Sequence, residues 1–236
     1  MADHRTADNS GDLELVLARL ARVYSTCSTY EDQGVVRESM PDESGEDQVS
    51  EDFFTTAFDR SAKRFRYEFR MGSPQPEMDL GCIVWRNGES VRMWTRLRDR
   101  IESQENIGLA IAGAVGNSGD SAFLMPNLMA HEEVEGRGLL DLDDLRLAGK
   151  TKFNNCDCLM ISGCYPSRSK LTVWVETKTS LILKTEEETA MAPQVGPQFH
   201  GIVMGSGPLV TKTIITYSPR INTLIPAAKF EMLVPE

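Results

Sequence analysis

Three cysteines lie close together in the second half of the chain, at Cys156, Cys158 and Cys164. Thiolates at such short spacing are potential zinc ligands, but a structural zinc site needs a fourth ligand. The histidines of the chain are isolated along the sequence and do not supply one. The simpler interpretation is that these thiols are buried and behave as small hydrophobic side chains. We therefore predict neither a metal site nor a cofactor.

The sequence lacks the motifs that usually carry catalysis. The glycine-rich stretch from Gly113 to Gly119 has no Lys-Ser/Thr pair of a phosphate-binding loop and no βαβ pattern around it. Neither G-x-S-x-G nor H-E-x-x-H occurs. The acids at Asp141, Asp143 and Asp144 are typical of a polar turn ahead of a strand. No catalytic residue is predicted, and the sequence favours a binding protein over an enzyme.

Aromatic and charged side chains alternate without exception over residues 64–70. Successive side chains on a strand point to opposite faces of a sheet, so Phe65, Tyr67 and Phe69 would share one face. The charged side chains would share the other face, which is exposed in many antiparallel sheets. The aromatic stripe is either ordinary core or the wall of a cavity for a hydrophobic ligand. Both interpretations hold if the cavity collapses when it is empty.

Hydrophobic periodicity predicts the elements that position these residues. A disordered tail over residues 1–11 precedes an amphipathic helix over residues 12–27, followed by strands at residues 30–39, 54–58 and 64–70. The acidic residues 41–52 lack periodicity and are expected to be the loop of a hairpin. A second hairpin over residues 82–95 has Asn87-Gly88 at its tip. In this hairpin Ile83, Trp85, Val91 and Met93 are expected to line one face.

Apolar residues stand among glycines between residues 101 and 130. Two short helices joined by a glycine-rich turn are predicted there, and their apolar sides must be covered. Glycine permits both close approach and movement of helices. The insert is therefore either a fixed cap on the core or a mobile lid over a binding site.

Strand patterns resume in the second half of the chain, at residues 142–147, 158–163, 171–176, 181–186, 211–217 and 229–234, with a loop over residues 190–209. The sequence thus predicts a mainly β (α+β) fold. A curved antiparallel sheet would form a half-open barrel, with the N-terminal helix and the mid-chain helical insert covering its concave face. Residues 12–236 are expected to form a single domain.

The formal net charge of −10 over 236 residues argues against nucleic-acid binding. No apolar run is long enough for a transmembrane helix. The acidic and basic residues are unevenly distributed: residues 1–59 carry 14 acids and 4 bases, whereas residues 60–100 carry 10 bases and 5 acids. This asymmetry indicates either a solvated strand face beside an acidic loop, or a basic face that meets an anionic partner or lipid head groups.

The succession of segments is more specific than any single motif. The segments are residues 23–30 (VYSTCSTY), 54–58 (FTTAF), 64–70 (RFRYEFR), 83–88 (IVWRNG), the helical insert, 171–176 (LTVWVE), 181–184 (LILK) and 226–235, which contains Phe230. In this order the chain resembles the bacterial outer-membrane lipoprotein carrier superfamily, in its branch of uncharacterised envelope proteins, over roughly residues 12–235. The resemblance implies a half-open β-barrel that holds acyl chains between barrel and helices. Asn154-Asn155 departs from the glycine expected before Cys156.

Twelve apolar residues on the strands and the insert are candidates for the wall of a ligand cavity. They are Phe58, Phe65, Tyr67, Phe69, Ile83, Trp85, Met93, Ile107, Ile111, Val115, Leu124 and Leu128. The first functional hypothesis is non-catalytic binding of a hydrophobic ligand, an acyl chain, lipid or lipoprotein, as a carrier of the cell envelope. Its partners would be lipids or acylated proteins, with peripheral contact to a membrane.

The alternative hypothesis is a ligand-free protein-interaction or envelope-stress sensor module of the same fold. Its docking surfaces would be the acidic loop and a basic face formed by Arg64, Arg66 and Arg70. The resemblance implies a periplasmic or envelope location. A cytoplasmic location is the alternative, because the N-terminal residues lack the apolar core of a signal peptide.

Overall fold

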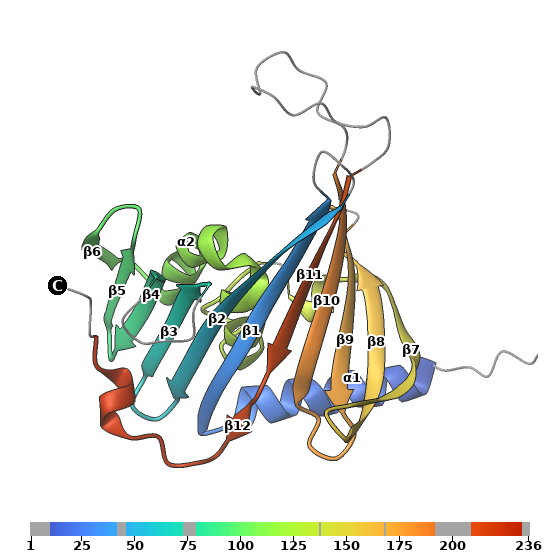
Figure 1. The fold of residues 1–236 in the computed structure, drawn as a ribbon. Helices are drawn as coiled ribbons and strands as arrows, with labels where there is room; N and C mark the ends of the chain where they lie inside the picture. The colour runs from blue at the N-terminus through green and yellow to red at the C-terminus, as the bar shows by residue number, and fades with distance from the viewer. Residues whose placement is uncertain are drawn as a thin grey trace, which may run out of the picture.

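The structure is a computed structural model that describes residues 10–41, 46–72, 79–136, 138–167, 169–191 and 209–232. Most of these residues belong to one twelve-stranded antiparallel sheet. The sheet curves, and the three α-helices lie on its concave side (Figure 1). Among the described residues its two edges, β6 and β7, do not pair with each other. The prediction of a mainly β fold with a half-open sheet is therefore confirmed.

Two meanders make up the sheet. The first contains β1 (Thr29–Pro41), β2 (Asp47–Asp59), β3 (Arg64–Met71), β4 (Leu80–Asn87), β5 (Ser90–Thr95) and β6 (Arg100–Gln104). The second contains β7 (Asp143–Phe153), β8 (Cys156–Cys164), β9 (Lys170–Glu176), β10 (Ile182–Met191) and β11 (Leu209–Tyr217). β1 pairs with β11 and joins the two meanders, and the short β12 (Arg220–Ile221) also pairs with β1.

The position of the helical insert follows from this topology. β6 and β7 lie at opposite edges, so the chain between them must cross the whole sheet. This connection contains α2 (Ile107–Ser118), α3 (Leu124–Met129) and two 3-10 helices, η1 (Gly119–Ala122) and η2 (Leu139–Asp141). α2 packs on β4 and β5, and every residue of α3 is buried. The predicted pair of short helices over the concave face is thus confirmed.

The N-terminal helix α1 (Ser10–Thr26) covers the lower part of the concave face beneath the second meander (Figure 1). Leu20 and Tyr24 on its apolar side are fully buried. The Tyr24 hydroxyl accepts a hydrogen bond from the backbone N–H of Ile182 at 3.0 Å, which ties the helix to β10. The helix predicted over residues 12–27 is confirmed, although it begins earlier. Residues 1–9 of the predicted tail lie outside the described residues.

A main hydrophobic core lies between the sheet and these helices. Its aromatic centre is Phe54, whose ring stacks on Tyr67 with centroids 6.1 Å apart and meets Tyr217 edge-on at 5.7 Å. Both contacts are within the range that stabilises aromatic pairs. Because Phe54, Tyr67 and Tyr217 come from β2, β3 and β11, they link the two meanders through the core.

The convex face of the first meander is also partly covered. The segment after β12 leads to η3 (Ala227–Phe230), which lies against β3. Ile225 and Phe230 pack with Ala57, and Met232 packs on a cluster of Leu80, Ile83 and Trp94 that also includes Trp85. The strand predicted over residues 229–234 is therefore wrong for its described part: residues 229–230 end η3, and residues 231–232 belong to no strand. Residues 233–236 lie outside the described part.

Several predicted boundaries differ from those observed. β2 already begins at Asp47, so only residues 42–46 separate β1 from β2 and the loop predicted over residues 41–52 is too long. Ile101 belongs to the unpredicted strand β6. The hairpin turn after β4 is Gly88-Glu89 rather than Asn87-Gly88, because Asn87 pairs with Ser90. Gly88 has φ +60°, which suits glycine at the first position of a two-residue turn.

Candidate functional site

A cavity of about 440 Å³ opens between the end of the sheet and the helical insert. This volume falls within the usual range for small-molecule sites. Its walls come from α1, β2, the β2–β3 turn, β3, β4, α2, α3 and the segment after α3. The lining residues are Ser25, Phe58, Arg60, Lys63, Arg64, Phe65, Arg86, Ile107, Ile111, Pro126, Leu128, Met129, Ala130, His131, Glu132, Glu133 and Val134.

The inner surface of the cavity is apolar. Phe58 and Phe65 are directly opposed on β2 and β3, so both rings lie on the same face of the sheet. Ile107 and Ile111 are one turn apart on α2, and Leu128 on α3 completes the wall. Each of these contacts follows from the alternation of strands and the spacing of helices. A ligand that buries hydrocarbon would meet apolar side chains along this wall.

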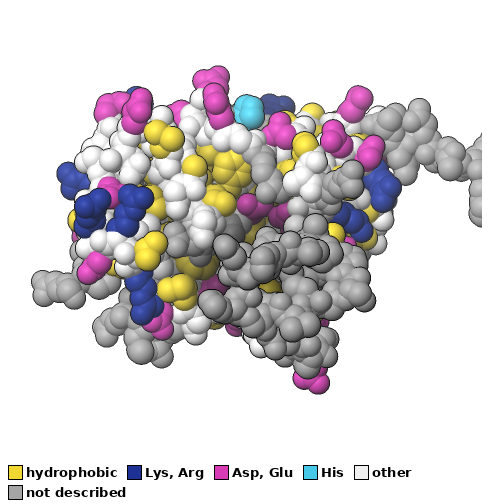
Figure 2. Space-filling view, turned by 90° about the horizontal axis from the view of Figure 1, so that it is seen from above, with side chains coloured by type: hydrophobic (Ala, Val, Ile, Leu, Met, Phe, Trp, Pro, Cys, Tyr) yellow, Lys and Arg dark blue, Asp and Glu magenta, His cyan; other side chains and the backbone are white. Residues whose placement is uncertain are grey.

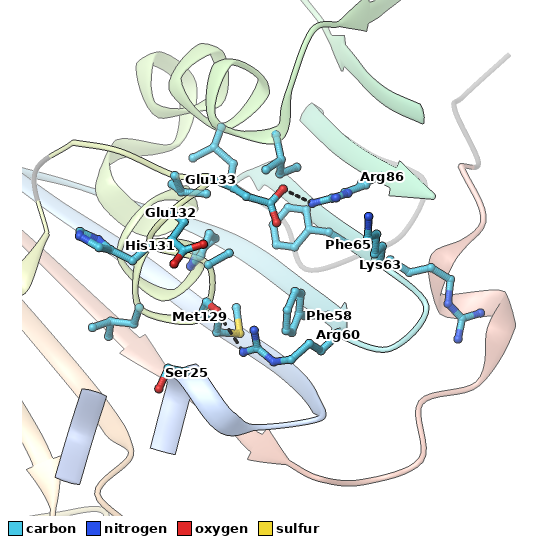
Figure 3. A pocket seen from close by; sticks show the side chains of 17 residues that line it. Ser25, Phe58, Arg60, Lys63, Phe65, Arg86, Met129, His131, Glu132 and Glu133 are labelled. Atoms are coloured by element: carbon cyan, nitrogen blue, oxygen red, sulfur yellow. Dashed lines mark hydrogen bonds and ion pairs between the residues drawn. The ribbon is translucent and has the colours of Figure 1, made fainter. Parts of the chain in front are cut away.

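Three cations line one side of the cavity (Figure 3). Arg60 and Lys63 belong to the β2–β3 turn, and Arg86 stands near the end of β4. The two turns are held together because the Gly88 N–H donates to the Lys63 carbonyl at 3.1 Å. Figure 3 shows Phe58 and Phe65 near these cations, so apolar and charged surfaces meet within one site.

Arg60 also clamps two helix ends. Its Nε donates to the Cys27 carbonyl at 2.9 Å, and one terminal nitrogen donates to the carbonyls of Tyr24 and Met129, each at 3.0 Å. α1 has no basic residue in its last turn. Arg60 therefore supplies the cation that helix C-termini favour. It fixes the end of α1, the end of α3 and the β2–β3 turn around the cavity.

The segment after α3 forms the opposite, acidic side. Glu133 Oε2 pairs with an Arg86 terminal nitrogen at 2.5 Å, while the Arg86 Nε donates to the Gly88 carbonyl at 2.9 Å. Val134 behind it is buried, and its carbonyl accepts from Asn127 Nδ2 at 2.7 Å. This segment is thus anchored at its base, with Glu133 reaching across the cavity to Arg86 (Figure 3).

Lys63 and Arg64 have partners on the outer side. Lys63 Nζ donates to Glu89 Oε1 at 2.6 Å and lowers the pKa of that carboxyl. Arg64 pairs with Asp59 at 2.6 Å and lies over the Phe230 ring at 4.5 Å. Partial burial would raise the pKa of Asp59, but hydrogen bonds from Arg64 and neighbouring groups lower it. Since Phe230 is on the convex side, Arg64 is directed away from the apolar interior.

Ten of the twelve predicted cavity residues lie in the main core or pack against it. Phe58, Phe65, Ile107, Ile111 and Leu128 line the cavity itself. The others fill the core nearby: Tyr67, Phe69, Met93, Val115 and Leu124. Tyr67 additionally shares a hydrogen bond of 2.7 Å with the Ser121 hydroxyl of η1, which fastens the insert to the sheet.

The placement of Ile83 and Trp85 in the cavity is wrong. Ile83 is opposed to Glu68, whereas Val84 is opposed to Tyr67. By the period-two rule Ile83 and Trp85 therefore point to the convex face. There the Trp85 indole N–H donates to the Phe230 carbonyl. β4 is apolar on both faces because the C-terminal segment covers it from outside.

The expectation of an exposed basic face is also wrong. Arg66 and Arg70 both pair with Glu68, a carboxylate with 6% exposure, and the three arginine side chains are only 15–26% exposed. Their charge is mostly compensated within the sheet. A docking role for Arg64, Arg66 and Arg70 remains a prediction. Because each of these arginines is paired with a carboxylate, the positive charge available to a partner is smaller than the sequence indicated.

Five residues of the cavity wall were not predicted from the sequence: Arg60, Lys63, Arg86, Met129 and Glu133. Arg86 was detectable, since it follows Val84 at the spacing of one strand face. Arg60 and Lys63 stand in a turn, where alternation carries no information about direction. Glu133 meets Arg86 only through the tertiary fold.

One further polar group is buried on the concave face. Asp32 is 3% exposed and accepts hydrogen bonds from the Tyr30 hydroxyl at 2.8 Å and the Ser218 N–H at 2.7 Å. Burial raises the pKa of Asp32 to about 7, although both hydrogen bonds oppose this shift. No ion pair of Asp32 is found among the described residues. This carboxyl therefore titrates near neutral pH.

Within the described ranges, no group of three or more His, Cys, Asp or Glu side chains is arranged to hold a metal ion. The described helices are all too short or too polar to cross a membrane. Seen from above, acidic side chains lie along much of the margin, and hydrophobic side chains are visible between polar ones nearer the middle (Figure 2).

No protein-family model matches the chain, and no curated protein matches it in sequence. Solved structures are similar in fold. The lipoprotein LppX of Mycobacterium tuberculosis has 9% identity and a TM-score of 0.46, covering 92% of this chain and 98% of LppX. A LolA superfamily protein of Nitrosomonas europaea has 9% identity and a TM-score of 0.35, covering 93% and 97%. A chain of the Pseudomonas aeruginosa MucA/MucB complex has 12% identity and a TM-score of 0.47, covering 94% and 61%.

At these identities the similarity describes the fold alone.

Proposed function

We propose that this protein binds a hydrophobic ligand, such as an acyl chain, in the cavity between the sheet and the helical insert. The observation that carries the proposal is the cavity of about 440 Å³ whose inner wall is formed by Phe58, Phe65, Ile107, Ile111 and Leu128. In support of the proposal, these side chains surround a space that is open to the outside. A purely structural core would be expected to close over such residues.

The energetics favour a hydrocarbon ligand. Each methylene moved from water into an apolar site contributes about 0.8 kcal/mol, so a partly enclosed chain is held without specific polar contacts. Met129 beside Leu128 adds an unbranched side chain that adapts to ligands of different shape. We expect affinity to rise with chain length until the cavity is full and then to level off.

The test is competition between a fluorescent fatty acid and unlabelled fatty acids of increasing length, with native mass spectrometry to count bound chains. Ala130→Trp should fill much of the cavity with an indole ring. The ligand would then lose apolar contact area worth more than about 1.4 kcal/mol, so binding should weaken about tenfold or more. Leu224→Trp is the matched control, because Leu224 is 95% exposed and does not line the cavity. Equal affinities for the two variants would refute the site.

Transport between membranes is the finer form of the proposal. It follows the resemblance to lipoprotein carriers and predicts a location in the cell envelope. Fractionation of the host cell with antibodies against the protein tests the location. Transfer of a labelled lipid between two vesicle populations tests the carrier role. If the transfer rate does not depend on the protein concentration, the protein binds lipid but does not carry it between membranes.

A further inference from the structure

We infer that the ligand is a single-chain amphiphile with an anionic head group, a carboxylate or a phosphate, bound by Lys63 and Arg86. This inference rests on the proposed function, because it names the chemical class of the ligand for the same cavity. The hydrocarbon chain would lie along the inner apolar wall. The head group would lie where Lys63 and Arg86 approach the cavity beside Phe65 (Figure 3).

Charge is the first argument. The cavity is lined by four Lys or Arg side chains and two Glu side chains, in a protein whose formal net charge is −10. Arg64 is directed to the convex side, and Arg60 donates three hydrogen bonds to backbone carbonyl oxygens, from Nε and one terminal nitrogen. Lys63 and Arg86 are each paired with a carboxylate, Glu89 and Glu133, but these partners are 82% and 49% exposed. Both cations can therefore exchange their partner for a ligand. The local field thus favours an anion although the whole molecule repels one.

The internal partner of Arg86 is the second argument. The Arg86 side chain is only 13% exposed, whereas that of Glu133 is 49% exposed. A cation as enclosed as Arg86 needs an anion beside it. Glu133 supplies one from a surface segment and is free to return to water. An incoming carboxylate or phosphate would replace it and keep Arg86 neutralised, so Glu133 acts as the competitor of the head group.

The arrangement of polar and apolar groups is the third argument. Arg86 and Phe65 are directly opposed on β4 and β3, so the guanidinium and the ring lie on the same face. An amphiphile needs this adjacency, because its charged head group is covalently attached to the end of its hydrocarbon chain. Arg86 is held in place by its hydrogen bond from Nε to the Gly88 carbonyl. Its terminal nitrogens are left to bind an anion in a fixed direction.

The experiment compares ligands with the same hydrocarbon chain and different head groups. Palmitate, palmitoyl lysophosphatidate, hexadecanol and hexadecyltrimethylammonium are titrated against the whole protein below their micellar concentrations, at about pH 8, where a carboxylate is ionised. Both anions should bind at least tenfold tighter than hexadecanol, and the cation should bind more weakly. The tighter of the two anions identifies the head group. Acetate and inorganic phosphate without a chain should not bind measurably.

Substitutions at Arg86 and Glu133 should change the affinity for palmitate in opposite directions. Arg86→Gln should weaken palmitate binding about tenfold and leave hexadecanol binding within twofold, because a charge-assisted hydrogen bond is lost only to the anion. Glu133→Gln should strengthen palmitate binding several-fold by removing the competitor. Glu132→Gln makes the same change in charge at a neighbouring cavity residue without an ion pair to Arg86, so its gain should be smaller.

The outcomes separate the two proposals. If no ligand binds, the proposed function fails. If palmitate and hexadecanol bind equally, or if the gains from Glu132→Gln and Glu133→Gln are equal, the cavity binds hydrocarbon without recognising the head group and this inference is overturned. Circular dichroism of each variant confirms that a loss of binding is not a loss of folding.

Discussion

Asp32 shows how a single residue links the interior of the sheet to pH. Its carboxyl is buried on β1 with two hydrogen-bond donors, Tyr30 and Ser218, and the uncharged Thr56 is opposed to it on β2. The buried hydroxyl groups of Tyr24 and Tyr217 are also close enough to interact with it electrostatically. None of these groups carries a positive charge. Ionisation of Asp32 is therefore opposed by burial and favoured only by hydrogen bonds.

Stability should fall as pH rises through the range set by Asp32. The pKa is about 7 in the folded protein and near 3.8 in the unfolded chain, so between these values the folded state holds a proton that the unfolded state has lost. The stabilising effect of protonation is complete at low pH and lost near pH 7, on the order of 4 kcal/mol in total. Asp32→Asn should remove this slope and raise stability at about pH 8.

Urea unfolding at several pH values between about 5 and 8 measures the slope. Asp59→Asn is the control. The pKa of Asp59 is lowered, so its contribution is present above its unfolded pKa and changes only in more acidic solution. An Asp32→Asn variant that keeps the slope of the unchanged protein would show that another group titrates in this range.

At the level of elements, two glycines of α2 have opposite roles. A Cβ at Gly108 would lie 2.6 Å from the Glu133 carbonyl oxygen, so the start of α2 packs directly on the segment that bears Glu133. Asn106 Oδ1 caps the same helix end by accepting from the Leu109 N–H at 2.9 Å. A Cβ at Gly116 would meet nothing within 4 Å.

Gly108→Ala should destabilise the protein by about 1–3 kcal/mol, because the backbone oxygen has to shift to admit a methyl group. Gly116→Ala should stabilise it by about 0.5–1 kcal/mol, since alanine is the better helix former at an open position. Denaturant midpoints with unchanged slopes would check both values. If Gly108→Ala leaves the free energy of unfolding unchanged, the Glu133 segment is not packed on α2. The position of Glu133 at the cavity would then be wrong.

Elements could be predicted from the sequence where local pattern decides them. The alternation of Phe65, Tyr67 and Phe69 gave the correct concave face, because β3 has charged residues on its other side. β4 could not be assigned in this way, since Ile83 and Val84 are both buried, one on each face. The cover over Ile83 comes from Met232, far along the chain. The charged part of the cavity was likewise hidden, because Arg86 and Glu133 meet only after the insert has crossed the sheet.

At the scale of the whole molecule, the pairing of β1 with β11 decides whether two meanders become one sheet. Gly34 lies on β1 opposite Tyr217 of β11 and Phe54 of β2. A Cβ at this position would lie 2.3 Å from both the Phe54 ring and the Thr216 carbonyl oxygen. The Phe54 ring and strand β11 can therefore approach β1 this closely only because Gly34 has no side chain.

Gly34→Ala should cost about 3 kcal/mol or more, because the Thr216 carbonyl belongs to the backbone and cannot rotate away. Gly11→Ala is the matched control at an open position in α1, where a Cβ would meet nothing within 4 Å. Thermal unfolding of both variants measures the difference. If Gly34→Ala melts like the control, the register between β1 and β11 is different from that described.

The order of strands also has a consequence during translation. β1 leaves the ribosome before strands β2 to β10, whereas its neighbour β11 leaves after them. Until β11 has been synthesised, the first meander exposes unpaired amide and carbonyl groups along the free edge of β1. It also exposes apolar side chains that the later strands will bury. We expect holdase chaperones to bind a nascent chain with such exposed surfaces. Ribosome profiling of chaperone-bound ribosomes should show that the chaperone dissociates only after residues 209–217 have emerged.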